Sequence, residues 1–309
     1  MNKLSLCCIS LRLQEQGIQG AAMTKKRFLM LERNEALKIV GERTLNNIKV
    51  TKETIKYCVD KGWNYRISSN LMPLETLPEA AVSYDILPNS QQIYDEFKAC
   101  AELIKNTKVR CSTHPDQYTV PASANPEVVK KSIIDLQCHG KAMDLFGLPQ
   151  SYEAPINIHM NSFKGDELKN IAKRFITVYN TLDNNVKSRL VLENEDKPNS
   201  WNVKQLYDYI YSEVGIPITY DSLHHRNNTG GLTPQKAYEI AKSTWGKFTP
   251  LFHFSDTEPS LNNPRAHADY ATIIHPEFIN NDVVDLECEF KAKDYAVEKI
   301  QKLIDISKK

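Results

Sequence analysis

Short apolar or β-branched runs recur along the chain, and stretches with helical spacing of apolar residues separate most of them. Runs of this length are typical of strands that are buried on both faces of a parallel sheet. Eight of them are found, at residues 3–9, 65–68, 108–113, 155–160, 189–192, 216–220, 250–254 and 283–288. Helical patterns occupy residues 51–61, 90–105, 126–145, 166–180, 202–214, 233–241 and 294–306.

The alternation of strand and helix predicts right-handed crossovers and therefore a parallel sheet. Eight repeats favour closure into an α/β (β/α)8 TIM barrel over an open doubly wound sheet, and 309 residues suit such a barrel. No Pro-, Gly- or Ser-rich linker divides the chain, so we expect a single domain over residues 1–309. Residues 11–46 are expected to form a long loop after the first strand, either solvated or touching a partner at the barrel mouth.

The composition excludes several classes of protein. Hydrophobic residues make up 41% and charged residues 25% of the chain, as in ordinary globular proteins. We expect no transmembrane helix, no signal peptide and a cytoplasmic monomer. Seven cysteines without a CxxC pair are expected to be buried and reduced rather than catalytic or zinc-bound. The formal net charge of +1 gives no global basic field, so a nucleic-acid partner would need a local basic patch.

Histidine and carboxylate side chains gather at the carboxyl ends of the predicted strands, which meet at one mouth in a TIM barrel. These residues are His114, His159, Glu193, Asp221, His253 and Glu289, with His224 three positions after Asp221. Imidazole and carboxylate ligands without thiolate favour zinc, manganese or iron over calcium. More than four candidate ligands imply more than one ion, as in phosphoryl-cleaving sites. The residues alone therefore predict a metal-dependent barrel, either a hydrolase or an isomerase.

The same residues carry a resemblance to the UV damage endonuclease family. Eight segments match the family's motifs in the family's order and span residues 65–293. They are YRISSNLMP at 65–73, STHPDQY at 112–118, NIH at 157–159, LENED at 192–196 followed by WN at 201–202, DSLHH at 221–225, FHFS at 252–255, RAHA at 265–268 and EFKAK at 289–293.

The resemblance implies a metal-dependent DNA repair endonuclease on a TIM barrel, related to endonuclease IV. Such an enzyme nicks double-stranded DNA immediately 5′ of cyclobutane dimers, 6-4 photoproducts and some abasic or distorted sites. Its cofactors would be two or three divalent ions, with manganese expected in preference to zinc or iron. The metal ligands carried over by position are His114, His159, Glu193, Asp221, His224, His253, His267 and Glu289. Three of them are expected to serve catalysis directly, namely Glu193, Asp221 and Glu289.

Candidate DNA contacts follow from the same resemblance. Gln117 and Tyr118 resemble the pair that the family inserts into the duplex at a lesion. A tyrosine ring can stack in the gap, and a glutamine amide can replace lost base hydrogen bonds. Further contacts to DNA are expected from Arg66, Lys164, Arg226 and Arg265, and the basic run at residues 25–27 could add phosphate contacts. Bound cations would make the mouth more positive than the net charge suggests.

Four positions depart from the family pattern. Leu77 stands where the family has a further histidine ligand, and Leu251 replaces a lysine two residues before the seventh-strand histidine. The first strand's tyrosine and asparagine, which contact the lesion in the family, align with Leu6 and Ser10. Glu75 is a candidate substitute for the missing ligand.

Three alternatives therefore stay open beside the UV damage endonuclease. They are a general abasic-site endonuclease of the endonuclease IV type, a catalytically impaired barrel that binds DNA or a partner, and a sugar-isomerase-like barrel.

Overall fold

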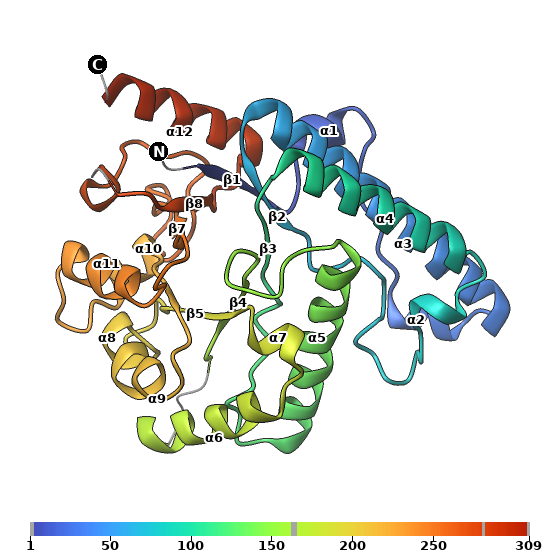
Figure 1. Cartoon of the computed structure of the whole chain (residues 1–309), viewed down its shortest axis with the longest axis horizontal. Coiled ribbons are helices and arrows are strands. Elements are labelled where there is room, and N and C mark those ends of the chain that lie inside the picture. The colour runs from blue at the N-terminus through green and yellow to red at the C-terminus, as the bar shows by residue number, and fades with distance from the viewer. Residues whose placement is uncertain (1–2, 162–165, 280–281, 308–309) are drawn as a thin grey trace.

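Eight parallel strands form one sheet in the computed structural model, which describes residues 3–161, 166–279 and 282–307 (Figure 1). The strands are β1 (Leu4–Cys7), β2 (Asn64–Ile67), β3 (Cys111–Thr113), β4 (Ile156–His159), β5 (Leu190–Glu193), β6 (Ile218–Thr219), β7 (Leu251–Phe254) and β8 (Asp285–Cys288). Each overlaps one of the eight apolar runs, and only β2 and β5 extend one residue beyond theirs, so the predicted eight-stranded α/β TIM barrel is confirmed.

The barrel closes at a narrow seam. The strand order is β6-β5-β4-β3-β2-β1-β8-β7, which leaves β6 and β7 at the two edges. The backbone N–H of His253 donates to the carbonyl of Tyr220 at 2.9 Å, and Asp221 and His253 form an isolated parallel bridge. The seam therefore holds two of the predicted site residues next to each other through the backbone.

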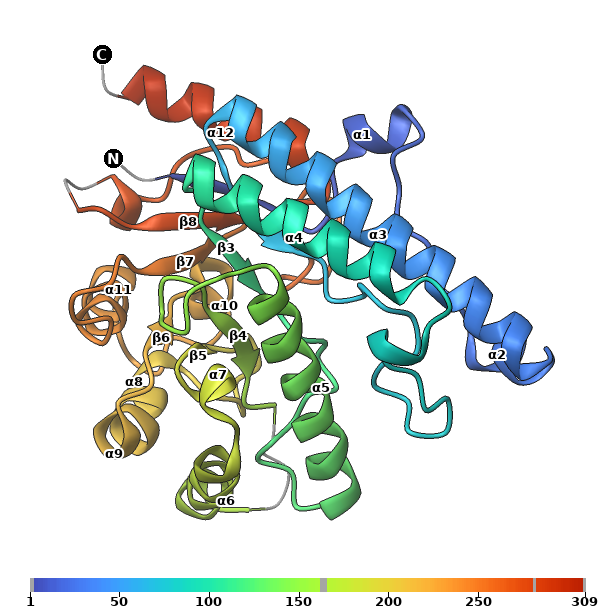
Figure 2. The same cartoon turned by 45° about the vertical axis from the view of Figure 1, so that its right-hand side comes forward.

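Helices connect the strands and cover the outside of the sheet (Figures 1 and 2). The helices that follow β2 are α4 (Ser90–Thr107), α5 (Pro126–Leu145), α6 (Leu168–Thr181), α7 (Asn184–Lys187), α8 (Val203–Leu206), α9 (Ser212–Val214), α10 (Ser222–Asn227), α11 (Pro234–Ser243) and α12 (Lys293–Ser307). Short helical turns are η1 (Tyr84–Ile86), η2 (Tyr207–Tyr211), which is π-helical, and η3 (Pro276–Phe278). None of the described helices has the length and apolar character needed to cross a membrane.

The segment 11–46 is largely helical, and our expectation of a long loop there was wrong. It contains α1 (Leu11–Glu15), α2 (Lys25–Leu29) and the first half of α3 (Arg33–Lys61). Apolar periodicity did not reveal α3 because polar or small residues occupy part of its buried face, among them Thr44 and Asn47. Asn47 donates through Nδ2 to the carbonyls of residues 21, 70 and 71. This buried amide binds α3 to two neighbouring loops.

A glycine lets α3 and α4 pack side by side (Figure 2). A Cβ atom on Gly41 would lie 2.1 Å from Oδ1 of Asn89, the residue before α4. In the absence of that Cβ, Nδ2 of Asn89 donates to the Gly41 carbonyl at 3.0 Å.

The barrel interior is polar, whereas the apolar core lies between the sheet and the helices. Alternate strand residues point into a barrel, and among them Arg66, Ser112, Asn157 and Glu287 are buried and hydrogen-bonded to one another or to Glu193. All seven cysteines are free thiols, five buried and two half-buried, so no disulfide contributes to the fold.

Candidate metal centre

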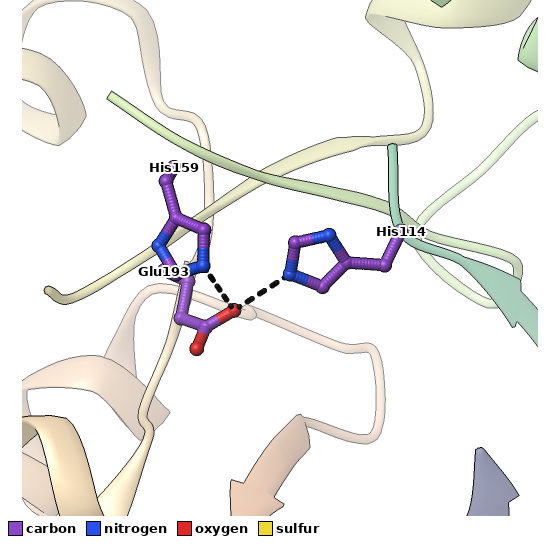
Figure 3. A group of neighbouring side chains, drawn as sticks. All are labelled: His114, His159 and Glu193. Atoms are coloured by element: carbon purple, nitrogen blue, oxygen red, sulfur yellow. Dashed lines mark hydrogen bonds and ion pairs between the residues drawn. The ribbon is translucent and has the colours of Figure 1, made fainter. Parts of the chain in front are cut away.

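Glu193 lies at the centre of the predicted site, where it is the last residue of β5 and 1% exposed. Its Oε2 lies 3.2 Å from Nε2 of His114, which follows β3 directly, and 3.6 Å from Nε2 of His159, the last residue of β4 (Figure 3). These three strands are neighbours in the sheet. The strand ends therefore bring two imidazoles to one carboxylate oxygen.

Two further histidines contact the same carboxylate. Nδ1 of His224, on α10, lies 3.0 Å from Oε1 of Glu193, and Nδ1 of His253, on β7, lies 3.1 Å from Oε2. Asn157 donates to Oε2 through Nδ2. Four imidazoles thus surround one buried carboxylate.

Asp221 and Glu289 extend the cluster across the barrel mouth. Asp221 is the N-cap of α10, where its Oδ1 accepts the backbone N–H of His224 at 2.6 Å. Oε1 of Glu289 lies 3.3 Å from Nδ1 of His253. His267 lies at the rim. Its Nδ1 lies 2.7 Å from the backbone carbonyl oxygen of Glu289 and 3.9 Å from Oε2 of the Glu289 side chain. All eight ligands predicted from the resemblance therefore lie in one connected cluster.

Seven of the eight residues, all except His267, form three groups, and within each group the candidate ligand atoms lie within 4.8 Å of one another. They are His114 with His159 and Glu193, Glu193 with Asp221 and His224, and Asp221 with His253 and Glu289. Adjacent groups share Glu193 or Asp221, so one carboxylate common to both connects each pair of neighbouring groups. A further group, Cys7 with Glu287 and Glu289, already holds the Arg66 guanidinium against both carboxylates.

The residues fit divalent cations on physical grounds. Oδ2 of Asp221 is a buried carboxylate oxygen that accepts no hydrogen bond, an arrangement that is costly unless a cation or proton compensates it. The donors are imidazole nitrogens and carboxylate oxygens, which suit zinc, manganese or iron. The described part of the chain therefore contains buried groups able to bind metal ions.

The electrostatics of the cluster keep the Glu193 carboxylate charged, whereas burial raises the pKa of Asp221. Burial opposes ionisation of Glu193, but the charges of His253 and His159 outweigh it and hold the Glu193 pKa well below its ordinary value. Burial likewise disfavours the His224 imidazolium, yet Asp221 and Glu193 raise the pKa of His224 to about 10. Burial lowers the pKa of His159 to about 3. Metal binding to such a cluster releases protons from imidazoles and is therefore pH-dependent.

The two candidate lesion-probing residues lie on the exposed turn between β3 and α5. Tyr118 is 77% exposed, and Gln117 is exposed beside it. Oδ1 of Asp116 accepts the Tyr118 N–H at 2.9 Å, and Asn161 donates to the Gln117 carbonyl at 3.0 Å. The backbone of this turn is therefore held in place while both side chains stay in solvent. Both residues line a cavity of about 640 Å³ that lies between the loop 67–78 and α5.

The four candidate basic contacts fall into different environments. Arg66 is buried inside the barrel, where NH1 contacts Glu287 and Glu289, so it faces carboxylates rather than the protein surface. Arg226 and Arg265 each have a 40% exposed side chain and pair with acidic residues, Arg226 with Asp256 at 3.2 Å and Arg265 with Asp196 at 3.8 Å. Lys164 lies outside the described residues.

The residues at the four positions that depart from the family pattern pack in the core or cap a helix, and none belongs to a candidate metal-binding group of the described residues. Leu77 is half-buried against the core, Leu251 and Leu6 are fully buried, and Ser10 caps α1 by accepting the Leu13 N–H. Glu75 belongs to none of the metal-binding groups and accepts a hydrogen bond from Tyr84 at 3.4 Å.

Sequence reasoning missed Asn157 and Glu287 as members of the site. Each lies two residues before a predicted ligand on the same strand, His159 and Glu289 respectively. Side chains two apart on a strand point to the same side. That alternation is the signal from which both could have been found.

Comparison with known proteins places the chain among DNA-damage nucleases. A family model described as UV-endonuclease UvdE matches residues 2–308. A UV DNA damage endonuclease of Nostoc sp. is 29% identical over 302 residues, which cover 96% of this chain and 88% of that protein. A UV DNA damage endonuclease of Bacillus cereus is 31% identical over 254 residues, which cover 78% of this chain and 75% of that protein.

Solved structures agree with this placement. The crystal structure of SacUVDE superposes with a TM-score of 0.81 at 28% identity and covers 98% of this chain and 99% of its own. A D-psicose 3-epimerase of Clostridium cellulolyticum superposes with a TM-score of 0.55 at 11% identity and covers 84% of this chain and 92% of its own. At that identity the epimerase shares only the barrel fold.

Proposed function

Because this chain belongs to the UV-endonuclease UvdE family, we propose that it is a metal-dependent DNA repair endonuclease that nicks double-stranded DNA 5′ of UV photoproducts. Membership of this family implies that the chain is a nuclease. The observation that carries the proposal is the buried Glu193 carboxylate amid four imidazoles, with Tyr118 exposed on the turn after His114.

We infer that the cluster binds two or three divalent ions, preferably manganese. His114 and His159 would hold one ion with Glu193, which would bridge to a second position beside Asp221 and His224. Of the remaining ligands, His253 and Glu289 form a group with Asp221, and His267 lies beside Glu289. When bound, such cations supply Lewis acidity that activates water and neutralises charge on the scissile phosphate.

The chain's own residues prepare this chemistry. Burial inside the barrel excludes bulk water from Glu193 and Asp221, which strengthens every charge interaction at the mouth. Asn157 holds one oxygen of Glu193 through its amide, so the carboxylate is oriented before any cation arrives. The site therefore has fixed ligands and fixed charge, the two conditions for electrostatic stabilisation of a phosphoryl transition state.

Lesion recognition is proposed for the exposed turn. The Tyr118 ring would stack in the gap left by distorted bases, and the Gln117 amide would offer a donor and an acceptor to the opposite bases. Arg226 and Arg265 at the rim would contact phosphates and thereby orient the duplex.

Plasmid nicking tests the proposal directly. With Mn²⁺ present, the wild-type chain should nick UV-irradiated supercoiled plasmid and leave unirradiated plasmid intact. His114→Ala and Glu193→Ala should each abolish nicking while the circular dichroism spectrum stays that of the wild type. His139→Gln is the matched control, because His139 lies on α5 and contacts Thr113 rather than the cluster. Equal nicking of both plasmids, or of neither, would contradict the proposal.

An abasic-site endonuclease is the second candidate, favoured by one observation. Leu6 is fully buried and Ser10 is engaged as a helix cap, so neither position offers the exposed lesion contact of the family. Incision of a synthetic duplex with one abasic site, compared with a duplex that carries one thymine dimer, separates the two activities. Faster incision of the abasic duplex supports the second candidate.

A further inference from the structure

The Glu287 carboxylate lies inside the barrel directly beneath the cluster. Glu287 is on β8, 1% exposed, and paired in register with His253 on β7. A carboxylate removed from water at this depth needs compensating partners.

Glu287 contacts one ring nitrogen of His253, and two carboxylates of the cluster contact the other. Nε2 of His253 lies 3.0 Å from Oε2 of Glu287. The other ring nitrogen, Nδ1, lies 3.1 Å from Glu193 and 3.3 Å from Glu289. Nδ1 is therefore the nitrogen of His253 that faces the cluster.

Other strands hold Glu287 in this position. Ser112 on β3 donates its hydroxyl to Oε1 of Glu287. NH1 of Arg66 on β2 lies 3.0 Å from Oε2 of Glu287 and also contacts Glu289. The guanidinium compensates the charge that burial disfavours, and the two donors leave Glu287 little rotational freedom.

We propose that Glu287 is a positioning residue for the metal ligand His253. With its carboxylate facing Nε2, Glu287 favours the tautomer that keeps the proton on Nε2 and the lone pair on Nδ1, and it directs Nδ1 toward Asp221 and Glu289. The inference rests on the proposed function for its cation. Outer carboxylates of this kind orient ligating imidazoles and raise their basicity, and their loss weakens metal affinity by about 10- to 100-fold.

Glu287→Gln tests the proposal, because glutamine keeps the size of the side chain and removes its charge. Asp285→Asn is the matched control. Asp285 is buried on the same strand and pairs with Arg110 at 3.0 Å, but it lies one layer deeper and does not touch His253. Both variants lose a buried ion pair, and only the first removes a charge that faces the imidazole.

Manganese affinity, measured by competition with a chelating dye on the whole chain, is the primary measurement. Glu287→Gln should weaken Mn²⁺ binding by about 10- to 100-fold, and Asp285→Asn should lower the melting temperature without changing that affinity. In nicking assays, Glu287→Gln should lower kcat at limiting Mn²⁺, recover it at high Mn²⁺, and keep the KM for DNA. Unchanged Mn²⁺ affinity in Glu287→Gln, or equal loss in both variants, overturns the proposal.

The two proposals fail separately. Tight Mn²⁺ binding that Glu287→Gln weakens, without nicking of irradiated DNA, rejects the proposed function and leaves the role of Glu287 intact. A wild-type chain that binds no Mn²⁺ overturns both. If Glu287→Gln does not fold, Ser112→Ala decides, since it removes one hydrogen bond to Glu287 and keeps every charge. Its Mn²⁺ affinity should fall below that of the wild type, and unchanged affinity overturns the proposal.

Discussion

The carboxyl group of Glu75 should make the stability of this protein depend on pH. Glu75 lines the cavity that also holds Tyr118, and its Oε2 accepts the Tyr84 hydroxyl at 3.4 Å. Burial, which outweighs the attraction of Lys141, raises the Glu75 pKa from 4.5 to about 7. The folded protein therefore holds this proton more tightly than the unfolded chain does.

The sign and size of the effect follow from linkage. With the folded pKa above the unfolded one, stability is highest below pH 4.5 and falls as pH rises toward about 7, where the folded carboxyl ionises. A shift from 4.5 to about 7 corresponds to a cost of about 3 kcal/mol in the unfolding free energy once both states are ionised. Glu75→Gln removes this cost and keeps an acceptor for Tyr84.

Urea unfolding of wild type and Glu75→Gln at about pH 5 and about pH 8 measures the effect, because the difference between the two proteins cancels groups that titrate in both. The gain in stability from the substitution should grow by about 2 to 3 kcal/mol between these two values of pH. Glu79→Gln on the same loop is the control, since Glu79 is exposed and its pKa is lowered by a hydrogen bond from its own backbone and by Lys25. A gain from Glu75→Gln that does not change with pH would refute the reasoning. Mn²⁺ stoichiometry should stay that of the wild type, because Glu75 is outside the metal groups.

Three further predictions concern the DNA and metal interactions. Tyr118→Ala should change the unfolding free energy by less than about 0.5 kcal/mol. It should lower kcat/KM on a dimer-containing duplex by about 5- to 150-fold, as expected for one lost base stack. Tyr118→Phe, the control, should retain most of the activity. Lys26→Glu and Arg27→Glu reverse exposed charges on α2. If each side chain contacts one phosphate, each substitution should reduce the slope of the logarithm of the DNA-binding constant against log[salt] by about 0.9. An unchanged slope would place α2 away from DNA. Mn²⁺ at about 100 times its Kd should raise the unfolding free energy by about 2.7 kcal/mol, measured by calorimetry, and Glu193→Ala should lose that gain.

Local pattern in the sequence was enough to find the strands and most of the candidate ligands. Each β-strand overlaps an apolar run, because a strand buried between the barrel interior and the helices cannot tolerate many exposed polar positions. Seven of the eight candidate ligands stand at or just after strand ends, and the rule that such ends converge needs no coordinates. His267 followed only from the resemblance to the family. The sequence by itself thus determined the barrel and most of the histidine and carboxylate cluster at its mouth.

Tertiary structure decided what each polar side chain faces. Arg66, expected to contact DNA, is buried against Glu287 and Glu289, because alternation along β2 turns it into the barrel. The first half of α3 escaped detection because the partners of its buried Asn47 lie in loops distant in sequence. Closure at the Asp221–His253 bridge is equally invisible in the sequence. Apolar periodicity reports burial along one element, whereas the pairing of buried polar groups depends on register between elements, which only the folded chain specifies.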